Sequence, residues 1–170
     1  AQNGGSVRIG SDNTDTLNIQ VVNGSYSYPN DIVSSIQLRG SESSVALYGK
    51  TISITTEDGI VNGLDFNFDG GSVVIGSDAT ESVTVNCFTI NNGDDASLKI
   101  NASKYIDLDS VTSSGGSFTQ IGNSDTENVH IYGTMWLHSG LNGGETEAII
   151  LGKNITFEVD PRTLFDGPVA

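Results

Sequence analysis

Apolar residues recur at every second position in short runs along this chain, and polar residues fill the positions between them. The alternation is clear at residues 7–9, 52–54 and 98–100, where Arg, Ser or Lys stands between two apolar residues. Successive side chains of a strand point to opposite faces, so this period predicts half-buried β-strands. β-branched residues dominate the runs, which favours strand over helix. Further runs of this kind occupy residues 17–19, 45–47, 83–85, 106–108, 129–131 and 157–159.

Turn-forming dipeptides separate many of these runs. Asn-Gly and Asp-Gly tolerate positive φ and suit tight hairpins, and they begin at Asn3, Asn23, Asp58, Asn62, Asp69, Asn92, Asn142 and Asp166. No convincing helical window interrupts the pattern. The chain is therefore predicted to be all-β, with repeated short strands and hairpins stacked as a β-helix-like, β-prism-like or sandwich-like array.

Two sequence units alternate along the chain. The first, which we call the A unit, occupies residues 5–19 and returns at 71–85 and, with one extra residue, at 116–131. It consists of a strand, a Gly-Ser-Asp-like bend, a Thr–acid pair and a second strand. The second, which we call the B unit, occupies residues 42–54 and matches residues 145–157 without a gap. A looser copy of the B unit occupies residues 95–108.

The order A-B-A-B-A-B predicts one repeat-built β domain over residues 1–160, with units at about 5–63, 71–109 and 116–159. Residues 26–31 with Pro29 look like an insertion, and we expect an exposed loop tip there. Pro161 and Pro168 oppose a continuing strand, so residues 161–170 are predicted to form an irregular C-terminal arm or cap.

Composition narrows the function classes. The 170 residues carry 7 Lys and Arg against 21 Asp and Glu, a formal net charge of −14. Like charges repel, which argues against nucleic acid or an anionic membrane surface as a direct partner. A single Cys excludes a disulfide framework within the chain and a multi-cysteine zinc site. No apolar run approaches the length of a membrane span, so membrane insertion is not expected.

The apolar content also bears on assembly. Only 36% of the residues are hydrophobic, and a single thin stack of such units would have little core for its surface. The units must stack on neighbours in the chain or pair with other chains. We therefore expect a homotrimer with intertwined strands, which would bury an apolar stripe from each chain along one axis and cover strand edges.

The A unit resembles the repeats of fibre and other fibrous virion proteins of tailed phages, especially cyanophages and marine phages. Those proteins carry many copies of a pattern like Ile-Gly-Ser-Asp-x-Thr-Asp-Thr-Leu-x-Ile/Val-x-Gly. Residues 9–19 and 75–85 match it closely, and residues 121–131 match it loosely. The resemblance implies a β-rich, elongated, trimeric structural protein on the surface of a phage particle, assembled in the host cytoplasm, with no catalytic residues to carry over.

The expected function is therefore that of a non-enzymatic virion protein, forming a short fibre or spike or decorating the capsid as a cement protein. Its expected partners are copies of itself, other virion proteins such as capsid or tail proteins, and a host-surface glycan. Ala1 is compatible with a processed native start and equally with a boundary inside a longer protein. Two other functions stay open: a receptor-binding adhesin, and a tailspike-like polysaccharide hydrolase that would use paired carboxylates.

Acidic residues recur at the bends of the A units, and they are the candidate metal ligands. Carboxylates gathered in a loop could hold Ca²⁺, which takes about six to eight oxygen ligands. Asp and Ser also favour turns because they bond their own backbone, and the spacing fits no EF-hand. We expect turn chemistry and no cofactor, with Ca²⁺ as the alternative. The residues concerned are Asp12, Asp15, Asp78, Glu81, Asp125 and Glu127.

The densest apolar and aromatic cluster is the main interface candidate, with an intersubunit core favoured over a receptor or glycan contact. It comprises Tyr132, Met135, Trp136 and Leu137, and Leu164 and Phe165 in the C-terminal segment are added as apolar anchors.

The remaining reactive side chains point to no catalytic site. His130 alternates with Val129 and Ile131, which predicts an outward orientation on a strand, and His138 is the only other His. No Ser or Cys stands near them in a triad-like pattern, so nucleophilic catalysis is not expected. Cys87 is interpreted as a small core residue. The glycosylation sequons at Asn23, Asn101 and Asn154 are interpreted as chance in an Asn-, Ser- and Thr-rich chain.

Overall fold

The computed structural model describes residues 5–21, 43–56, 64–66, 70–86, 90–92, 95–133, 135–138 and 145–158. These residues form β-strands joined by turns and loops, which confirms the predicted all-β class. The described residues contain no helix. They therefore include no helix that is long and apolar enough to cross a membrane.

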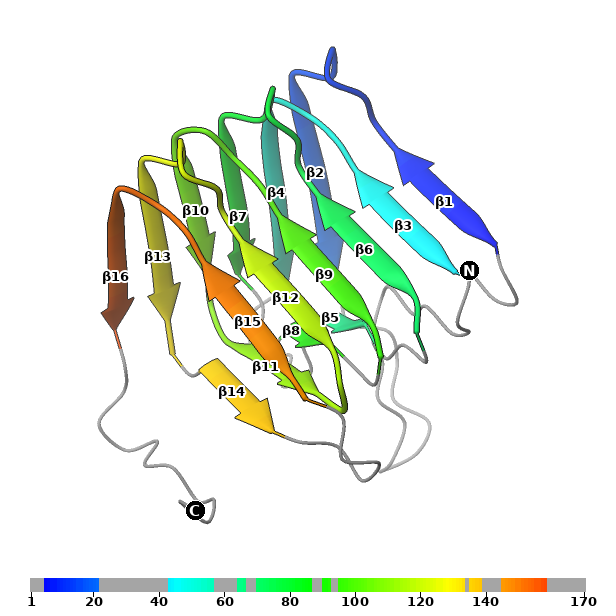
Figure 1. The fold of residues 1–170 in the computed structure, drawn as a ribbon. Helices are drawn as coiled ribbons and strands as arrows, with labels where there is room; N and C mark the ends of the chain where they lie inside the picture. The colour runs from blue at the N-terminus through cyan, green and yellow to red at the C-terminus, as the bar shows by residue number, and fades with distance from the viewer. Residues whose placement is uncertain are drawn as a thin grey trace.

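The strands form three sheets that lie around one axis, and Figure 1 shows the strands of each sheet stacked along it. The first sheet contains β1 (Ser6–Ile9), β3 (Ser44–Leu47), β6 (Ser72–Ile75), β9 (Ser97–Ile100), β12 (Phe118–Ile121) and β15 (Glu147–Ile150). The second contains β2 (Thr16–Val21), β4 (Thr51–Thr56), β7 (Ser82–Asn86), β10 (Tyr105–Leu108), β13 (Asn128–Tyr132) and β16 (Asn154–Glu158). The third contains β5 (Leu64–Phe66), β8 (Ile90–Asn92), β11 (Val111–Ser114) and β14 (Met135–His138).

The chain visits the sheets in rotation and returns to the first sheet one strand further along the axis. Coil 1 holds β1 and β2, coil 2 holds β3 to β5, coil 3 holds β6 to β8, coil 4 holds β9 to β11, coil 5 holds β12 to β14, and coil 6 holds β15 and β16. All pairs among the described strands are parallel, as between β3 and β6 and between β4 and β7. A chain wound in stacked coils of parallel strands is a β-helix, one of the predicted architectures.

The hairpins expected from the turn signals are wrong for the described strands. The two strands of one A or B unit lie in different sheets, and each pairs with the equivalent strand of the neighbouring unit. Val45 of β3, for example, lies beside Val7 of β1 and Val73 of β6. A period of two marks a half-buried strand but does not say which strand lies beside it, so the alternation fits both arrangements. Most of the Asn-Gly and Asp-Gly dipeptides lie outside the described residues.

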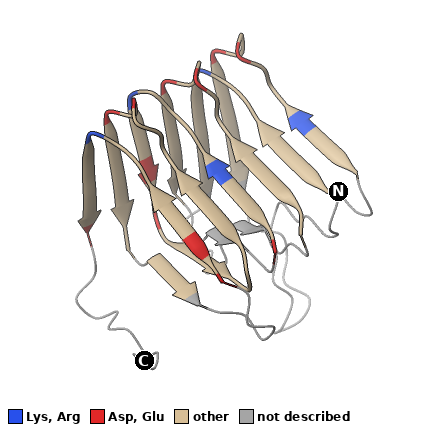
Figure 2. Ribbon diagram, viewed as in Figure 1, with Lys and Arg blue, Asp and Glu red and all other residues tan. Residues whose placement is uncertain are grey.

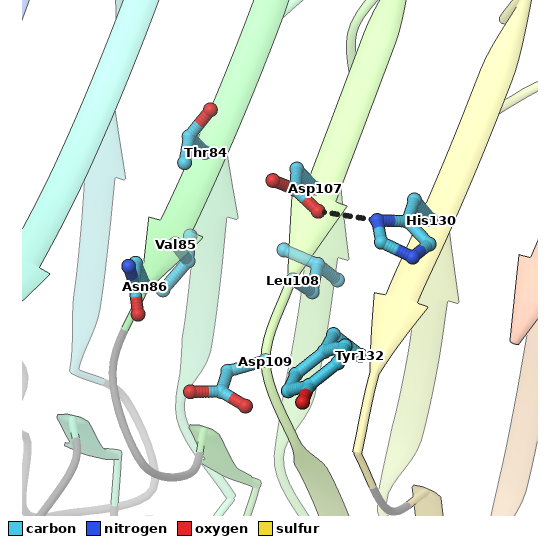
Figure 3. Close-up of a pocket in the computed structure, with 8 residues that line it drawn as sticks. All are labelled: Thr84, Val85, Asn86, Asp107, Leu108, Asp109, His130 and Tyr132. Atoms are coloured by element: carbon cyan, nitrogen blue, oxygen red, sulfur yellow. Dashed lines mark hydrogen bonds and ion pairs between the residues drawn. The ribbon is translucent and has the colours of Figure 1, made fainter. Parts of the chain in front are cut away.

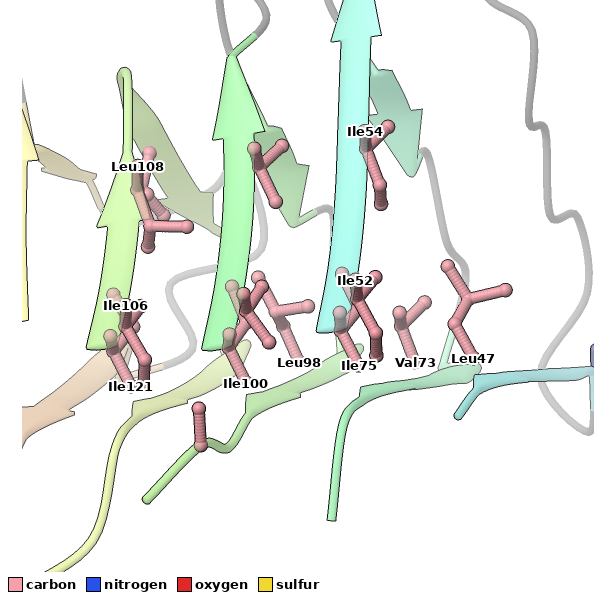
Figure 4. Close-up of a cluster of buried hydrophobic side chains, with 14 of the residues drawn as sticks. Leu47, Ile52, Ile54, Val73, Ile75, Leu98, Ile100, Ile106, Leu108 and Ile121 are labelled. Carbon is pink, nitrogen blue, oxygen red and sulfur yellow. The ribbon is translucent and has the colours of Figure 1, made fainter. Parts of the chain in front are cut away.

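One chain encloses the apolar core by itself. Inward side chains of the first and second sheets meet inside the coils, as Figure 4 shows for Leu47, Ile52 and Ile75. Leu98, Ile100 and Ile106 continue the same columns and are also fully buried. Four-residue strands such as β3 and β6 each contribute two buried apolar residues, and strands on the other sides enclose them. The low apolar content therefore does not require partner chains for a core, and the intertwined trimer stays a prediction.

Candidate functional site

The corners between the first and second sheets form the most regular feature of the molecule. Long corners from the A units, such as residues 76–81 and 122–127, alternate along the axis with short corners from the B units, such as residues 48–50 and 151–153. Gly76 begins a long corner with φ of +83°, and Gly10 and Gly122 have nearly the same conformation. Glycine adopts this left-handed region without the Cβ penalty, which explains the Gly of the repeat.

Each long corner is held by the same local hydrogen bonds. In coil 3 the Ser77 N–H donates to Thr80 Oγ1 at 2.9 Å, and the Thr80 N–H donates to the Ser77 carbonyl at 3.0 Å. The Ala79 N–H donates to Ser77 Oγ at 3.2 Å. Ser11 and Thr14 repeat the pattern in coil 1, as do Asn123 and Thr126 in coil 5. The Ser and Thr of the motif are therefore turn-closing groups.

The same Thr also joins neighbouring coils. Thr80 Oγ1 donates to the Gly49 carbonyl of coil 2 at 2.8 Å, and Thr126 Oγ1 donates to the Ala102 carbonyl of coil 4 at 2.7 Å. Thr80 and Thr126 are fully buried. A buried hydroxyl that accepts one bond and donates another satisfies two backbone groups at once.

Thr80→Val should therefore lower the free energy of unfolding by about 1–3 kcal/mol, because it leaves the Ser77 N–H and the buried Gly49 carbonyl without partners. Thr14→Val is the matched control, since Thr14 closes the same turn in coil 1 but is only half-buried. It should cost less than about 1 kcal/mol. Urea unfolding followed by circular dichroism measures both. Equal losses would mean that the bond between coils contributes nothing.

The proposed calcium ligands are engaged mainly by Lys and by turn groups. Lys50 Nζ lies 2.6 Å from Asp15 Oδ1, and Lys104 Nζ lies 2.7 Å from Glu81 Oε2. The hydrogen bonds and charges of these Lys residues lower the pKa of Asp15 and Glu81 from their ordinary values. Within the described ranges, no three His, Cys, Asp or Glu side chains gather closely enough to hold a metal ion. The calcium alternative stays a hypothesis, which a fall in Tm on adding a chelator would support.

The remaining acids take part in the corners in other ways. Asp12 Oδ1 accepts a 2.7 Å hydrogen bond from Ser77 Oγ, two coils away, over the short corner between them. Asp78 Oδ1 accepts from Asn101 Nδ2 at 2.8 Å. Asp125 contributes its backbone N–H, which donates to Asn123 Oδ1, and Glu127 lies near Lys104. Asn101 itself is buried, so its side chain is part of the corner structure.

A column of alternating charge, not predicted from the sequence, runs along this edge. Asp15, Lys50, Glu81, Lys104, Glu127 and Lys153 occupy equivalent corner positions of coils 1 to 6. Figure 2 shows acidic and basic residues following one another along the edge where the corners stack. The available signal was the Lys that recurs in each B unit at the place where the A unit has its acid.

A shallow groove on the outer face of the second sheet is the other candidate site. It has a volume of about 280 Å³ and is lined by Thr84, Val85, Asn86, Asp107, Leu108, Asp109, His130 and Tyr132 (Figure 3). The His130 Nδ1 and Asp107 Oδ1 atoms are 2.9 Å apart, and the His130 Nε2 atom is 3.9 Å from Glu158 Oε2. The predicted outward orientation of His130 is confirmed. Its pairing with Asp107 needed the register of β10 and β13, which local sequence does not reveal.

Asp109 gives a test of the electrostatics of this groove. Burial, and then the charge of Asp107, raise the pKa of Asp109 above its ordinary 3.8. A carboxyl with a raised folded-state pKa lowers stability as pH rises through that interval, because the unfolded chain releases the proton first. Asp109→Asn should therefore raise Tm slightly at pH 7, by less than about 4 °C. The gain should disappear near pH 3, roughly where the carboxyl is protonated in both states. A gain that persists in acid would exclude charge burial as its cause.

The interface candidates fall into two groups. Tyr132, Trp136 and Leu137 are exposed, whereas Met135 packs against the apolar core. Tyr132 lies at the end of β13 beside the groove, and the other three belong to β14 at the edge of the third sheet. Leu164, Phe165, Cys87 and the Pro29 loop lie outside the described residues.

Comparisons with protein-family models, with curated proteins and with solved structures gave no match for this chain.

Proposed function

We propose that this chain is a non-enzymatic structural protein of a tailed-phage virion, located on the particle surface as a short fibre, spike or capsid-decorating protein. The observation that carries the proposal is the role of the phage-like repeat. Its Gly, Ser and Thr close the long corners and tie one coil to the next. The motif thus supports a continuous stiff rod, which suits a protein that braces a particle or extends from it.

A trimer, if formed, would use the outer faces of complete β-helices. Strands from β3 to β12 in the first sheet and from β4 to β13 in the second are paired on both edges within the chain. Strand exchange would break those ladders, so three chains are expected to pack side by side. Such contacts would involve exposed aromatic residues such as Tyr105 on the second sheet and Trp136 on the third.

The test is to purify virions of the phage that encodes the chain through a density gradient and identify their proteins by mass spectrometry. The chain should be present in intact particles, and a map of the particle should show β-helical density on its exterior. Sedimentation of the purified protein tests the trimer separately. Abundance in infected cells together with absence from intact particles would contradict the virion role.

The groove supports a second candidate function, attachment to a host-surface glycan. Asn86, Asp107, Asp109 and His130 offer hydrogen-bonding groups to sugar hydroxyls, and the exposed ring of Tyr132 offers a face for stacking. Binding of phage-host polysaccharide by the purified protein, weakened in Asp107→Asn and His130→Ala but not in Lys99→Ala on another sheet, would support it. No binding would contradict it.

Incubation with the same polysaccharide also tests for hydrolysis, by measuring the release of reducing sugar. A carboxyl with a raised pKa next to an ionised one is the arrangement that acid–base cleavage of glycosides requires, and Asp109 lies beside Asp107 in the groove. Release of reducing sugar that is abolished by Asp109→Asn would establish the hydrolase alternative and overturn the non-enzymatic proposal.

A further inference from the structure

The two ends of the β-helix expose side chains whose equivalents are buried in every central coil. Val7 and Ile9 of coil 1 are 41% and 40% exposed, whereas Val73 and Ile75 of coil 3 are 1% and 0% exposed. At the other end, Ile155 and Phe157 of coil 6 are 43% and 46% exposed. The equivalent residues of coil 2, Ile52 and Ile54, are fully buried. Both ends are therefore apolar surfaces at the edges of parallel sheets.

The polar groups of the first corner are exposed in the same way. Gly76 and Gly122 are buried, but Gly10 is exposed. Thr80 is fully buried and bonded to coil 2, but its equivalent Thr14 is only half-buried. Coil 1 thus has the groups with which an A unit binds a preceding B unit, while the described chain holds no earlier coil.

The order of the repeats shows which coil could precede coil 1. Coil 1 is an A unit and coil 6 is a B unit, so a second copy placed end to end would continue the alternation without a break. The sequences at that junction match those at the junction of coils 2 and 3, since residues 145–157 align with 42–54 and residues 9–19 align with 75–85. The junction of coils 2 and 3 is therefore an internal template for a contact between copies.

The template specifies individual hydrogen bonds. Between coils 2 and 3, Gly76 N–H donates to the Leu47 carbonyl at 2.8 Å, and Glu81 N–H donates to the Lys50 carbonyl at 2.7 Å. Thr80 Oγ1 donates to the Gly49 carbonyl at 2.8 Å. In a stack of two copies the corresponding donors are Gly10 N–H, Asp15 N–H and Thr14 Oγ1. The corresponding acceptors are the carbonyl groups of Ile150, Lys153 and Gly152.

The charge column makes one orientation favourable. It begins with Asp15 on coil 1 and ends with Lys153 on coil 6 (Figure 2). Stacking the N-terminal end of one copy on the C-terminal end of another brings Asp15 beside Lys153, as Glu81 lies near Lys50 within the chain. Two N-terminal ends would bring two Asp15 carboxylates together, and two C-terminal ends would bring two Lys153 ammonium groups together. Like charges in contact select against both alternatives.

From these observations we propose that the chain binds a second copy of itself head to tail, with β1 and β2 of one molecule pairing with β15 and β16 of the next. The contact is heterologous and does not close by symmetry, so it generates a linear filament along the β-helix axis. This association is independent of the proposed virion role, and it is distinct from the side-by-side packing of a trimer.

The 170-residue chain in about 0.15 M salt, where its net negative charge is screened beyond about 8 Å, is the sample for the test. Sedimentation velocity should show a series of oligomers whose largest member grows as the protein concentration rises. Lys153→Glu should weaken association about tenfold or more, since a loss of about 1.4 kcal/mol is tenfold. Lys99→Glu is the matched control, because it changes the net charge equally on an exposed position of central strand β9. It should leave association nearly unchanged.

Cross-linking through two exposed corner positions determines the polarity. In a Cys87→Ser background, Asp15→Cys and Lys153→Cys chains are mixed and oxidised, and each variant is also oxidised alone. The mixture should give disulfide-linked heterodimers, and neither variant alone should give homodimers. Because Asp15 and Lys153 are exposed corner residues, both variants should fold, which circular dichroism checks.

Three results would overturn the proposal. The first is a chain that stays monomeric up to about 1 mM, where a contact of only about 4 kcal/mol would be detectable. The second is equal association of Lys153→Glu and Lys99→Glu, as a closed lateral trimer would give. The third is homodimer formation by either Cys variant alone at the yield of the mixture.

Discussion

Gly76→Ala should lower the free energy of unfolding by about 3 kcal/mol or more, and Tm by about 6 °C or more. Two penalties combine at this position. The φ of +83° lies in the left-handed region that L side chains rarely adopt. A Cβ built there would also lie far inside van der Waals contact of the Asn101 carbonyl oxygen, a backbone atom of the next coil. Because that carbonyl belongs to the stacked corner, relief requires separating coils 3 and 4.

Gly49→Ala is the matched control for this prediction. Gly49 also lies in the column of corners, but its φ is not in the left-handed region, and an added Cβ would be no closer than 3.4 Å to its neighbours. Its substitution should change the free energy of unfolding by less than about 1 kcal/mol. Urea unfolding of both variants, followed by circular dichroism, measures the difference. Similar losses at the two positions would show that the cost arises from glycine loss in general and not from the close approach of two coils.

Ile106→Ala should cost about 2–5 kcal/mol, the usual range for removing a fully buried aliphatic side chain and leaving a cavity. Ile106 of coil 4 is fully buried between Val83 of coil 3 and Val129 of coil 5, its register partners on either side. Both partners are held in their own ladders, so they have little freedom to fill the space. The cavity term should therefore be retained.

Ile155→Ala tests the same substitution at the end of the same column. Ile155 is the register partner of Val129 but is 43% exposed. It should cost about 1 kcal/mol or less in a dilute sample, since only part of its area is removed from water. Thermal unfolding at low protein concentration keeps this measurement on the single chain. A loss as large as that of Ile106→Ala would mean that coil 6 is already covered there, and a loss that grows with concentration would indicate a second copy.

Part of the candidate site could be predicted from local sequence. Asp12 and Asp15 lie at a corner and His130 faces outward on a strand, because turn formation and side-chain alternation depend on residues close in the chain. The pairing of His130 with Asp107 and the ion pair of Lys50 with Asp15 could not be predicted in this way. They join residues of successive coils, and insertions of different length between the units hide which positions meet.

Assembly, too, could be predicted from the sequence only in part. The low apolar content suggested that partner chains complete the core, but the strands of one chain surround Leu47, Ile52 and Ile100 without help. Composition counts apolar residues but does not say whether they face one common interior. The proposed need for a partner therefore moves from the core to the two end coils, where Ile9 and Phe157 are exposed.

By itself, the sequence determined the all-β class, the alternating A and B units and the alternation of inward and outward residues in the runs of the first and second sheets. These follow from side-chain period and turn chemistry, which act over a few residues. Only the tertiary structure decided that every described strand pair is parallel and that the strands of one unit lie in different sheets. That choice depends on contacts between residues one coil apart, where the apolar columns and the bonded corners form together. Local pattern is the same for a hairpin and for a coil, so the distinction lies in the packing of the whole stack.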